Sequence, residues 1–183
     1  MRKRILGSYS EVNLFQINPK NKYQKKSLEK IIGDLKSGKI KTYMFYSPQV
    51  RTGKTYFMAG LFNYLFNYTQ DLLWKADKEL KEDFLRYEME EIEYHIVDYI
   101  KGDRVPKLYA LFWDDIGKAT VSDYVLQEIF YMLDEMIKRE TKLYLTSIID
   151  LSEIGNVYGI SIARRIEDLI DEILYFGEEM LMD

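Results

Sequence analysis

The amino-acid sequence predicts an α/β fold of three layers, in which a mainly parallel five-stranded sheet lies between helices. Short apolar segments alternate along the chain with helix-like segments of ten or more residues, the order expected when crossover helices join parallel strands. The sequence Gly53-Lys54-Thr55 also separates one such strand from one such helix, in the strand, loop and helix order of a phosphate-binding loop. The length of 183 residues suits one domain.

The first elements follow from hydrophobic periodicity and from glycine. Apolar residues recur at helical spacing within residues 24–36, and Gly38 ends this helix before an apolar, aromatic strand at residues 40–46. Beyond the loop, apolar residues recur at steps of three and four from Lys54 to Leu65. This spacing predicts a helix that begins inside the loop itself.

The later elements are predicted in the same way. Residues 71–76 indicate a short strand, and residues 77–100 indicate a long, acidic helix that ends before Gly102. Residues 108–113 form a continuous apolar run, which is typical of a strand buried on both faces. Further helices are expected at residues 122–139, where Ser122 suits the N-cap, and 160–169, and further strands at residues 142–149 and 172–176.

Composition excludes several classes of protein. The chain has no cysteine, so it contains neither disulfides nor a zinc site built on cysteine, and an intracellular protein is the simpler interpretation. No apolar run approaches the roughly 18 to 20 residues that span a bilayer, and the basic N-terminus leads into no secretion signal. We therefore expect a soluble, cytoplasmic protein without a membrane partner.

Charge is distributed unevenly along the chain. Residues 1–60 carry 13 Lys and Arg against 3 Asp and Glu, whereas residues 61–183 carry 13 against 27. A basic segment can bind the phosphates of a nucleic acid, but a solvated helix face explains the lysines at positions 20, 22, 25, 26 and 30 equally well. Both interpretations remain open for this segment.

The loop before the second helix carries the clearest chemistry. Backbone N–H groups of such a loop surround nucleotide phosphates, the lysine (Lys54) neutralises charge on the β- and γ-phosphates, and the hydroxyl (Thr55) holds magnesium. Pro48 occupies the first glycine position of the motif, so one backbone donor is lost and the loop entry differs from the common form. We predict that the chain binds ATP and Mg²⁺ through Pro48, Gln49, Val50, Arg51, Thr52, Gly53, Lys54, Thr55 and Tyr56.

A second motif lies where the apolar strand ends, at Asp114-Asp115-Ile116-Gly117. A magnesium-nucleotide site needs a carboxylate at the carboxyl edge of a strand beside the loop, and ligands of open α/β sheets bind at that edge. We expect Asp114 to bind magnesium through water, together with Thr55, and Asp115 to orient or activate the attacking water. An aspartate-rich turn at the end of a strand is the alternative interpretation.

Five segments in this order resemble a known family. They are Asn18-Pro19-Lys20-Asn21 with Gln24, the phosphate loop, Trp113-Asp114-Asp115-Ile116-Gly117, Leu145-Thr146-Ser147-Ile148-Ile149-Asp150-Leu151, and Ala163-Arg164-Arg165-Ile166. The chain resembles, from about residue 12 to 177, the AAA+ ATPase domain of DnaC- and DnaI-type helicase loaders and of IstB transposition helpers. The resemblance implies an ATPase that acts as an oligomer on DNA and either delivers a replicative helicase or helps a transposase.

The resemblance also assigns residues beyond the two motifs. Its members end one strand in Thr-Ser-Asn, whose asparagine senses the γ-phosphate; here Ile148 stands in that place, and Ser147 or Thr146 is left as a substitute. Arg165 matches the arginine finger that reaches the γ-phosphate of a neighbouring subunit, with Arg164 as the second choice. A solvated helix pair near Glu167 and Asp168 is the alternative for both arginines.

The sequence therefore predicts one AAA+ domain over residues 1–183, with a basic segment at residues 1–39, a nucleotide-binding core at residues 40–177 and no separate helical lid domain. The expected function is a weak or partner-stimulated ATPase that resembles a helicase loader of DNA replication. Its expected partners are ATP and ADP, further copies of the chain through Arg165, DNA, and a replicative helicase or a transposase. The alternatives are an IstB-like transposition helper or other DNA-remodelling or packaging ATPase, and a nucleotide-dependent binding module that hydrolyses little or no ATP.

Overall fold

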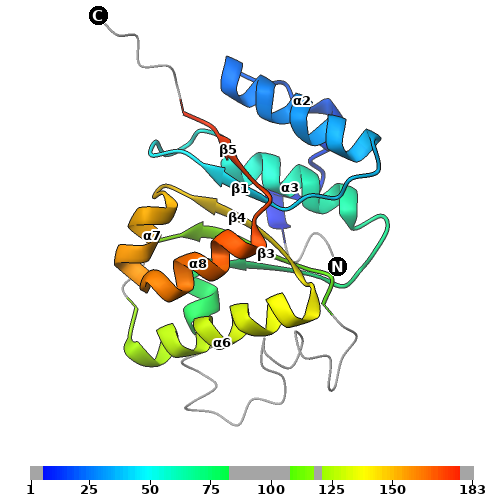
Figure 1. The fold of residues 1–183 in the computed structure, drawn as a ribbon. Helices are drawn as coiled ribbons and strands as arrows, with labels where there is room; N and C mark the ends of the chain where they lie inside the picture. The colour runs from blue at the N-terminus through cyan, green and yellow to red at the C-terminus, as the bar shows by residue number, and fades with distance from the viewer. Residues whose placement is uncertain (1–5, 83–107, 118–120, 178–183) are drawn as a thin grey trace, which may run out of the picture.

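The computed structural model describes residues 6–82, 108–117 and 121–177. After two short 3₁₀ helices, Gly7–Tyr9 and Leu14–Gln16, strands and helices alternate (Figure 1). The strands are β1 (Tyr43–Tyr46), β2 (Leu72–Ala76), β3 (Ala110–Ile116), β4 (Lys142–Ser147) and β5 (Glu172–Tyr175). The helices are α2 (Lys22–Lys36), α3 (Lys54–Leu65), α6 (Asp123–Arg139), α7 (Leu151–Tyr158) and α8 (Ile160–Leu169).

The five strands form one sheet in the order β2-β3-β4-β1-β5, and every neighbouring pair is parallel. This arrangement confirms the predicted α/β fold with a five-stranded sheet. Because β1, β3 and β4 are adjacent and parallel, the loops that follow them meet at the same edge of the sheet. The phosphate loop follows β1, and the two aspartates lie near the end of β3.

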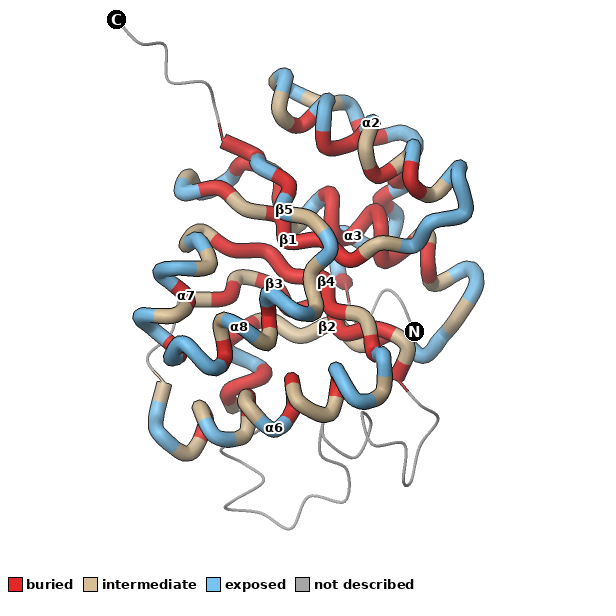
Figure 2. Tube along the Cα trace, viewed as in Figure 1, coloured by how far each residue is buried: buried red, intermediate tan, exposed pale blue. Residues whose placement is uncertain are grey.

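Helices cover both faces of the sheet (Figure 1). Alternate residues of each strand point to opposite faces, so Tyr43 and Phe45 join a core with α2, α3 and the N-terminal residues. Met44 and Leu145 join a second core with α6, α7 and α8. The buried strands at the centre of Figure 2 are therefore apolar on both faces. No helix among the described residues is long and apolar enough to cross a membrane.

The structure differs from the sequence prediction around α7, which was missed. The predicted strand at residues 142–149 ends at Ser147, and a new helix starts at Leu151. A capping box causes this change: the Asp150 side chain accepts from the N–H of Glu153, and the Glu153 side chain accepts from the N–H of Asp150. Of the predicted helix at residues 77–100, residues 77–82 are helical and the remainder lies outside the described part of the chain.

A buried polar cluster fixes the start of that helix against β3 and α7. The Lys81 ammonium lies 2.8 Å from the Asp77 carboxylate, and both side chains are almost fully buried. The Trp113 indole donates to the same carboxylate at 3.1 Å, and the Tyr158 hydroxyl donates to it at 3.0 Å. The Tyr158 oxygen in turn accepts from Lys81 and from the N–H of Gly117. Burial, followed by the charge of Asp77, raises the pKa of the Tyr158 phenol, so it stays protonated as a donor.

Replacing Asp77 by alanine is expected to lower the free energy of unfolding by about 3 to 5 kcal/mol, because the buried Lys81 ammonium then loses the carboxylate that lies 2.8 Å from it. Urea denaturation followed by tryptophan fluorescence measures the change. The double variant Asp77→Ala/Lys81→Met should regain most of the loss. Glu82→Ala is the matched control, because the Glu82 pair with Lys78 is exposed and such pairs contribute under about 1 kcal/mol. A loss below 1 kcal/mol for Asp77→Ala contradicts the prediction.

Candidate functional site

The loop between β1 and α3 has the backbone shape of a phosphate-binding loop. Gly53 stands at the N-cap of α3 with φ of 84°, a left-handed conformation that glycine adopts without steric cost. Arg51 is also left-handed, with φ of 60°. The loop therefore turns sharply into α3, so the free N–H groups of the first helical turn face the edge of the sheet.

One side chain from outside the loop helps to hold it. The Gln24 amide donates to the carbonyl oxygen of Thr52 at 2.9 Å, and its own oxygen accepts from the N–H of Lys20 at 2.6 Å. Gln24 is buried and belongs to α2, whose N-cap is Asn21. Gln24 belongs to the family pattern of the sequence, but no role was predicted for it. A contact across 28 residues leaves no signal in local spacing.

Lys54 lies in the first turn of α3, and its ammonium is surrounded by oxygens of the loop. It donates to the carbonyl of Gln49 at 2.8 Å, to the carbonyl of Ser47 at 3.3 Å and to the Thr52 hydroxyl at 3.3 Å. The side chain is only 5% exposed and still lines the cavity described below. The loop thus holds one positive charge at the position where the motif places the phosphates.

Two hydroxyls bind the Asp114 carboxylate. Thr55 donates to Asp114 Oδ1 at 3.0 Å, and Thr146, from the neighbouring strand β4, donates to the same oxygen at 2.6 Å. A hydroxyl beside a carboxylate is an oxygen-donor pair that suits magnesium, which also keeps several waters and phosphate oxygens as ligands. The predicted metal residues Thr55 and Asp114 are therefore brought together. Among the described residues, no three acidic or histidine side chains gather as a metal cluster.

Asp115 owes its position to an irregularity in β3. The register between β3 and β4 shifts between Trp113 and Ile116, and Asp115 has φ of 61°. Such a bulge re-aims one side chain of a strand, and the Asp115 side chain here lines the cavity. The N–H of Asp115 donates to the Thr146 hydroxyl at 2.8 Å. Thr146, which the sequence offered only as a substitute sensor, thus contacts both aspartates.

The phosphate loop and Asp115 border one cavity of about 480 Å³, a volume typical of small-molecule sites. Asp114 is not part of its lining and is linked to it by the hydrogen bond from Thr55. The cavity is lined by Tyr9, Val50, Arg51, Thr52, Gly53, Lys54, Thr55, Tyr56, Asp115 and Ile148. Phosphate-binding groups, a carboxylate and aromatic rings thus share one space. The Lys54 ammonium suits the phosphates of a nucleotide, and the oxygens of Thr55 and Asp114 suit magnesium.

The other two predicted catalytic residues lie outside this cavity lining. The Ser147 hydroxyl donates to the carbonyl of Ile149 at 2.7 Å and accepts from the Ile149 N–H at 3.0 Å, so it closes the turn after β4. Ile148, one residue further, does line the cavity. The assignment of Ser147 as a γ-phosphate sensor remains a prediction.

Arg165 lies on α8 and is held by α6 of the same chain. Its guanidinium lies 3.1 Å from the Asp134 carboxylate and 3.7 Å from the centroid of the Phe130 ring. The pKa of the Asp134 carboxyl is lowered, first by the hydrogen bond from Lys138 and then by Arg165. Arg165 Nε is buried and has no hydrogen-bond partner among the described residues. Arg164, the second choice, is exposed on the same helix.

Comparisons with known proteins find similarity in structure rather than in sequence. No protein-family model matches the chain, and no curated protein matches it significantly. The crystal structure of the DnaC helicase loader superposes with a TM-score of 0.75 at 17% identity, covering 93% of this chain and 99% of that one. The structure of DnaI gives 0.70 at 19% identity, covering 97% and 92%.

A third similar structure is DnaA from Aquifex aeolicus bound to AMPPCP, with a TM-score of 0.70 at 14% identity, covering 91% of this chain and 50% of that one. At such identities a likeness concerns the fold alone. Together with the strand order and the parallel pairing, these superpositions show that the chain has the α/β fold of the AAA+ domains of the DnaC and DnaI helicase loaders and of DnaA.

Proposed function

We propose that this chain binds ATP with Mg²⁺, hydrolyses it weakly or on stimulation by a partner, and acts in DNA replication like a helicase loader. One observation carries the proposal: Lys54, Thr55, Asp114 and Asp115 come from two distant segments and converge at one edge of the sheet. The motifs of the sequence predict these residues and their roles. Their convergence at one edge of the sheet supports complementary roles for them.

Each side chain has a defined task in this proposal. Lys54 and the N–H groups at the start of α3 bind and orient the phosphates. Thr55 and Asp114 hold Mg²⁺, which neutralises charge on the phosphate oxygens when bound. Asp115, aimed into the cavity by the bulge, orients a water for attack and accepts its proton. Thr146 fixes both aspartates through one hydroxyl.

The DNA-related role is supported by the fold and by charge. One structural neighbour is the replication initiator DnaA bound to AMPPCP and single-stranded DNA, with a TM-score of 0.72 at 14% identity. The present chain exposes Lys20, Lys22 and Lys25 around a hollow at the start of α2, where a phosphate backbone can bind.

Phosphate release from ATP, measured with and without single-stranded DNA and at increasing protein concentration, tests the proposal. Turnover that stays absent under every condition contradicts the hydrolytic part.

Replacing Asp115 by asparagine is expected to reduce turnover by about two orders of magnitude or more while ATP still binds. Asparagine keeps the size of the side chain and tolerates the left-handed backbone at this position, so the fold is preserved. Single-turnover phosphate release and a fluorescent ATP analogue measure the two quantities. Asp71→Asn, an exposed aspartate before β2, is the matched control. Equal turnover in wild type and Asp115→Asn would remove Asp115 from the mechanism.

A second function is favoured by one residue of the cavity. Ile148 lines it together with Asp115, at the position where the resemblance expects a polar γ-phosphate sensor. An apolar side chain there cannot position water by hydrogen bonding. We therefore keep a nucleotide-dependent binding module with little hydrolysis as the alternative, and a chain that binds ATP tightly but releases no phosphate supports it.

A further inference from the structure

The cavity has two chemically different walls. One is formed by the phosphate loop, with Gly53, Lys54 and Thr55. The other carries two tyrosine rings, Tyr9 and Tyr56, whose centroids lie 6.4 Å apart with an interplanar angle of 69°. The phosphates of a nucleotide need only the first wall. The second has the chemistry of a surface for an aromatic, uncharged group.

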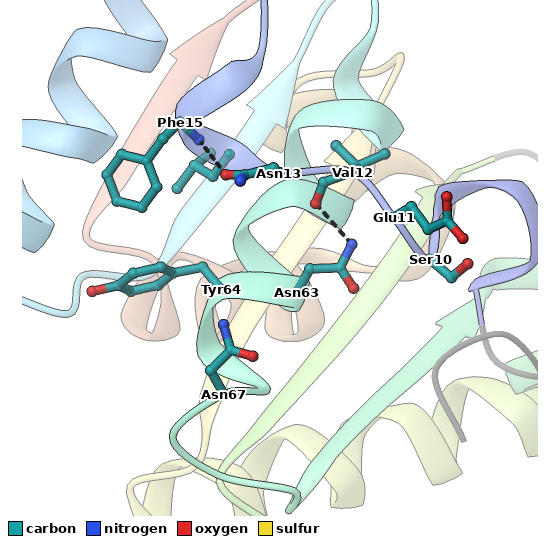
Figure 3. A pocket seen from close by; sticks show the side chains of 9 residues that line it. Ser10, Glu11, Val12, Asn13, Phe15, Asn63, Tyr64 and Asn67 are labelled. Carbon is teal, nitrogen blue, oxygen red and sulfur yellow. Dashed lines mark hydrogen bonds between the residues drawn. The ribbon is translucent and has the colours of Figure 1, made fainter.

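Tyr9 reaches this cavity from a segment far away in the sequence. Asn63 of α3 holds that segment, because its side-chain amide donates to the carbonyl of Tyr9 at 2.9 Å. The same amide donates to the carbonyl of Val12 at 3.0 Å, as Figure 3 shows. Asn63 is buried, with 6% of its surface exposed. Since α3 also begins with Lys54, one helix sets the position of both Tyr9 and the phosphate loop.

Close packing makes this attachment rigid. Gly60 lies one turn before Asn63, and a Cβ atom there would approach the Leu14 backbone to 3.2 Å and Ile17 Cδ1 to 3.1 Å. Leu14 and Ile17 are themselves buried in the core below. The N-terminal residues therefore lie directly on the helix backbone. This packing holds the segment that carries Tyr9 in a fixed position, as a ligand-binding residue requires.

The side chain of Tyr9 is accessible to a ligand. Its side chain is partly exposed, at 38% for the residue, as is Tyr56 at 41%. The Tyr9 hydroxyl has no hydrogen-bond partner within the described part of the chain, whereas its carbonyl oxygen accepts from Asn63 and from the N–H of Val12. An aromatic ring with a free hydroxyl, fixed at the rim of a phosphate cavity, matches the base of a nucleotide, which offers a planar face and polar edges.

We propose that Tyr9, together with Tyr56, forms the contact surface for the base of the bound nucleotide, and that Asn63 is the positioning residue for Tyr9. This inference rests on the proposed nucleotide site and adds to it the part that distinguishes a nucleotide from a bare polyphosphate. It assigns a binding role to a residue that lies 44 positions before the motif that anchors the phosphates.

The test compares two ligands that share the phosphates but differ in the base. Calorimetry in the presence of Mg²⁺ measures the affinity of ATP and of inorganic tripolyphosphate for wild type, Tyr9→Ala and Tyr9→Phe. Tyr9→Ala should weaken ATP binding on the order of tenfold, the size of one aromatic contact with a base, and leave tripolyphosphate binding unchanged. Tyr9→Phe keeps the ring and should lose less. Tyr131→Ala is the matched control, because Tyr131 is also partly exposed and lies on α6.

Each remaining outcome decides the inference. If Tyr9→Ala binds ATP like wild type, or loses both ligands equally, the base contact is wrong while the phosphate site stands. If wild type binds neither ligand, the nucleotide site itself is wrong and the inference is lost with it. Asn63→Ala provides the second readout, since a positioning role predicts a selective loss of ATP affinity, whereas general destabilisation weakens both ligands together.

Discussion

Replacing Lys54 by alanine is expected to reduce ATP turnover by about two to three orders of magnitude and to weaken nucleotide binding. The variant removes the charge that the loop holds among the oxygens of Ser47, Gln49 and Thr52. The phosphates then lie near the carboxylates of Asp114 and Asp115 without the positive charge of Lys54. Phosphate release and titration with a fluorescent ATP analogue measure the two losses.

Lys25→Ala is the control for this prediction, because the Lys25 side chain is 70% exposed on α2 and pairs only weakly with Glu29. It should retain wild-type turnover in the absence of DNA. Lys54→Met preserves the apolar stem and separates loss of charge from loss of packing. Wild-type turnover in either Lys54 variant contradicts the phosphate-loop assignment.

Arg165→Ala is expected to lower turnover by about a thousandfold, because an arginine finger stabilises the charge of the transition state. In the proposed oligomer, such a finger would act on the site of a neighbouring copy, so mixing two inactive variants tests the assignment directly. In a random mixture of Arg165→Ala and Lys54→Ala chains, about a quarter of the interfaces combine an intact Lys54 with an intact Arg165. The mixture should therefore recover a corresponding part of the activity that neither variant has alone.

Two features of the structure sharpen this experiment. Arg165 is held by Asp134 and Phe130 within one chain, so it must leave these contacts to reach a neighbour, and Asp134→Asn should ease its release. Arg139→Ala is the matched control, since the pair that Arg139 forms with Glu135 within the described residues is long, at 3.9 Å, and partly exposed. A mixture that stays inactive, with both variants folded by circular dichroism, assigns Arg165 to the surface of one chain instead.

The fold and the phosphate site were predictable because their signals are local. Consecutive residues are enough to identify a loop between a strand and a helix. The same is true of a carboxylate that follows an apolar strand. Gln24, Thr146 and Tyr9 reach the site only through tertiary contacts that span 28 to 47 residues, and spacing carries no information about such contacts. The helix α7 is a different case, because the Asp150 and Glu153 capping pair is present in the sequence just beyond the predicted strand at residues 142–149, and no helix was predicted from it.

The left-handed backbone at Asp115 restricts which residues can serve there. Glycine, asparagine and aspartate adopt this conformation most readily, and other residues do so at a cost on the order of 1 to 2 kcal/mol. Glu140 has a similar φ of 56°, so a glutamate is compatible with a left-handed backbone in this chain, but at that higher cost. A glutamate at position 115 would also extend its carboxylate by one methylene. The local shape of β3 therefore favours the shorter acidic side chain at the position where we propose that a carboxylate orients water.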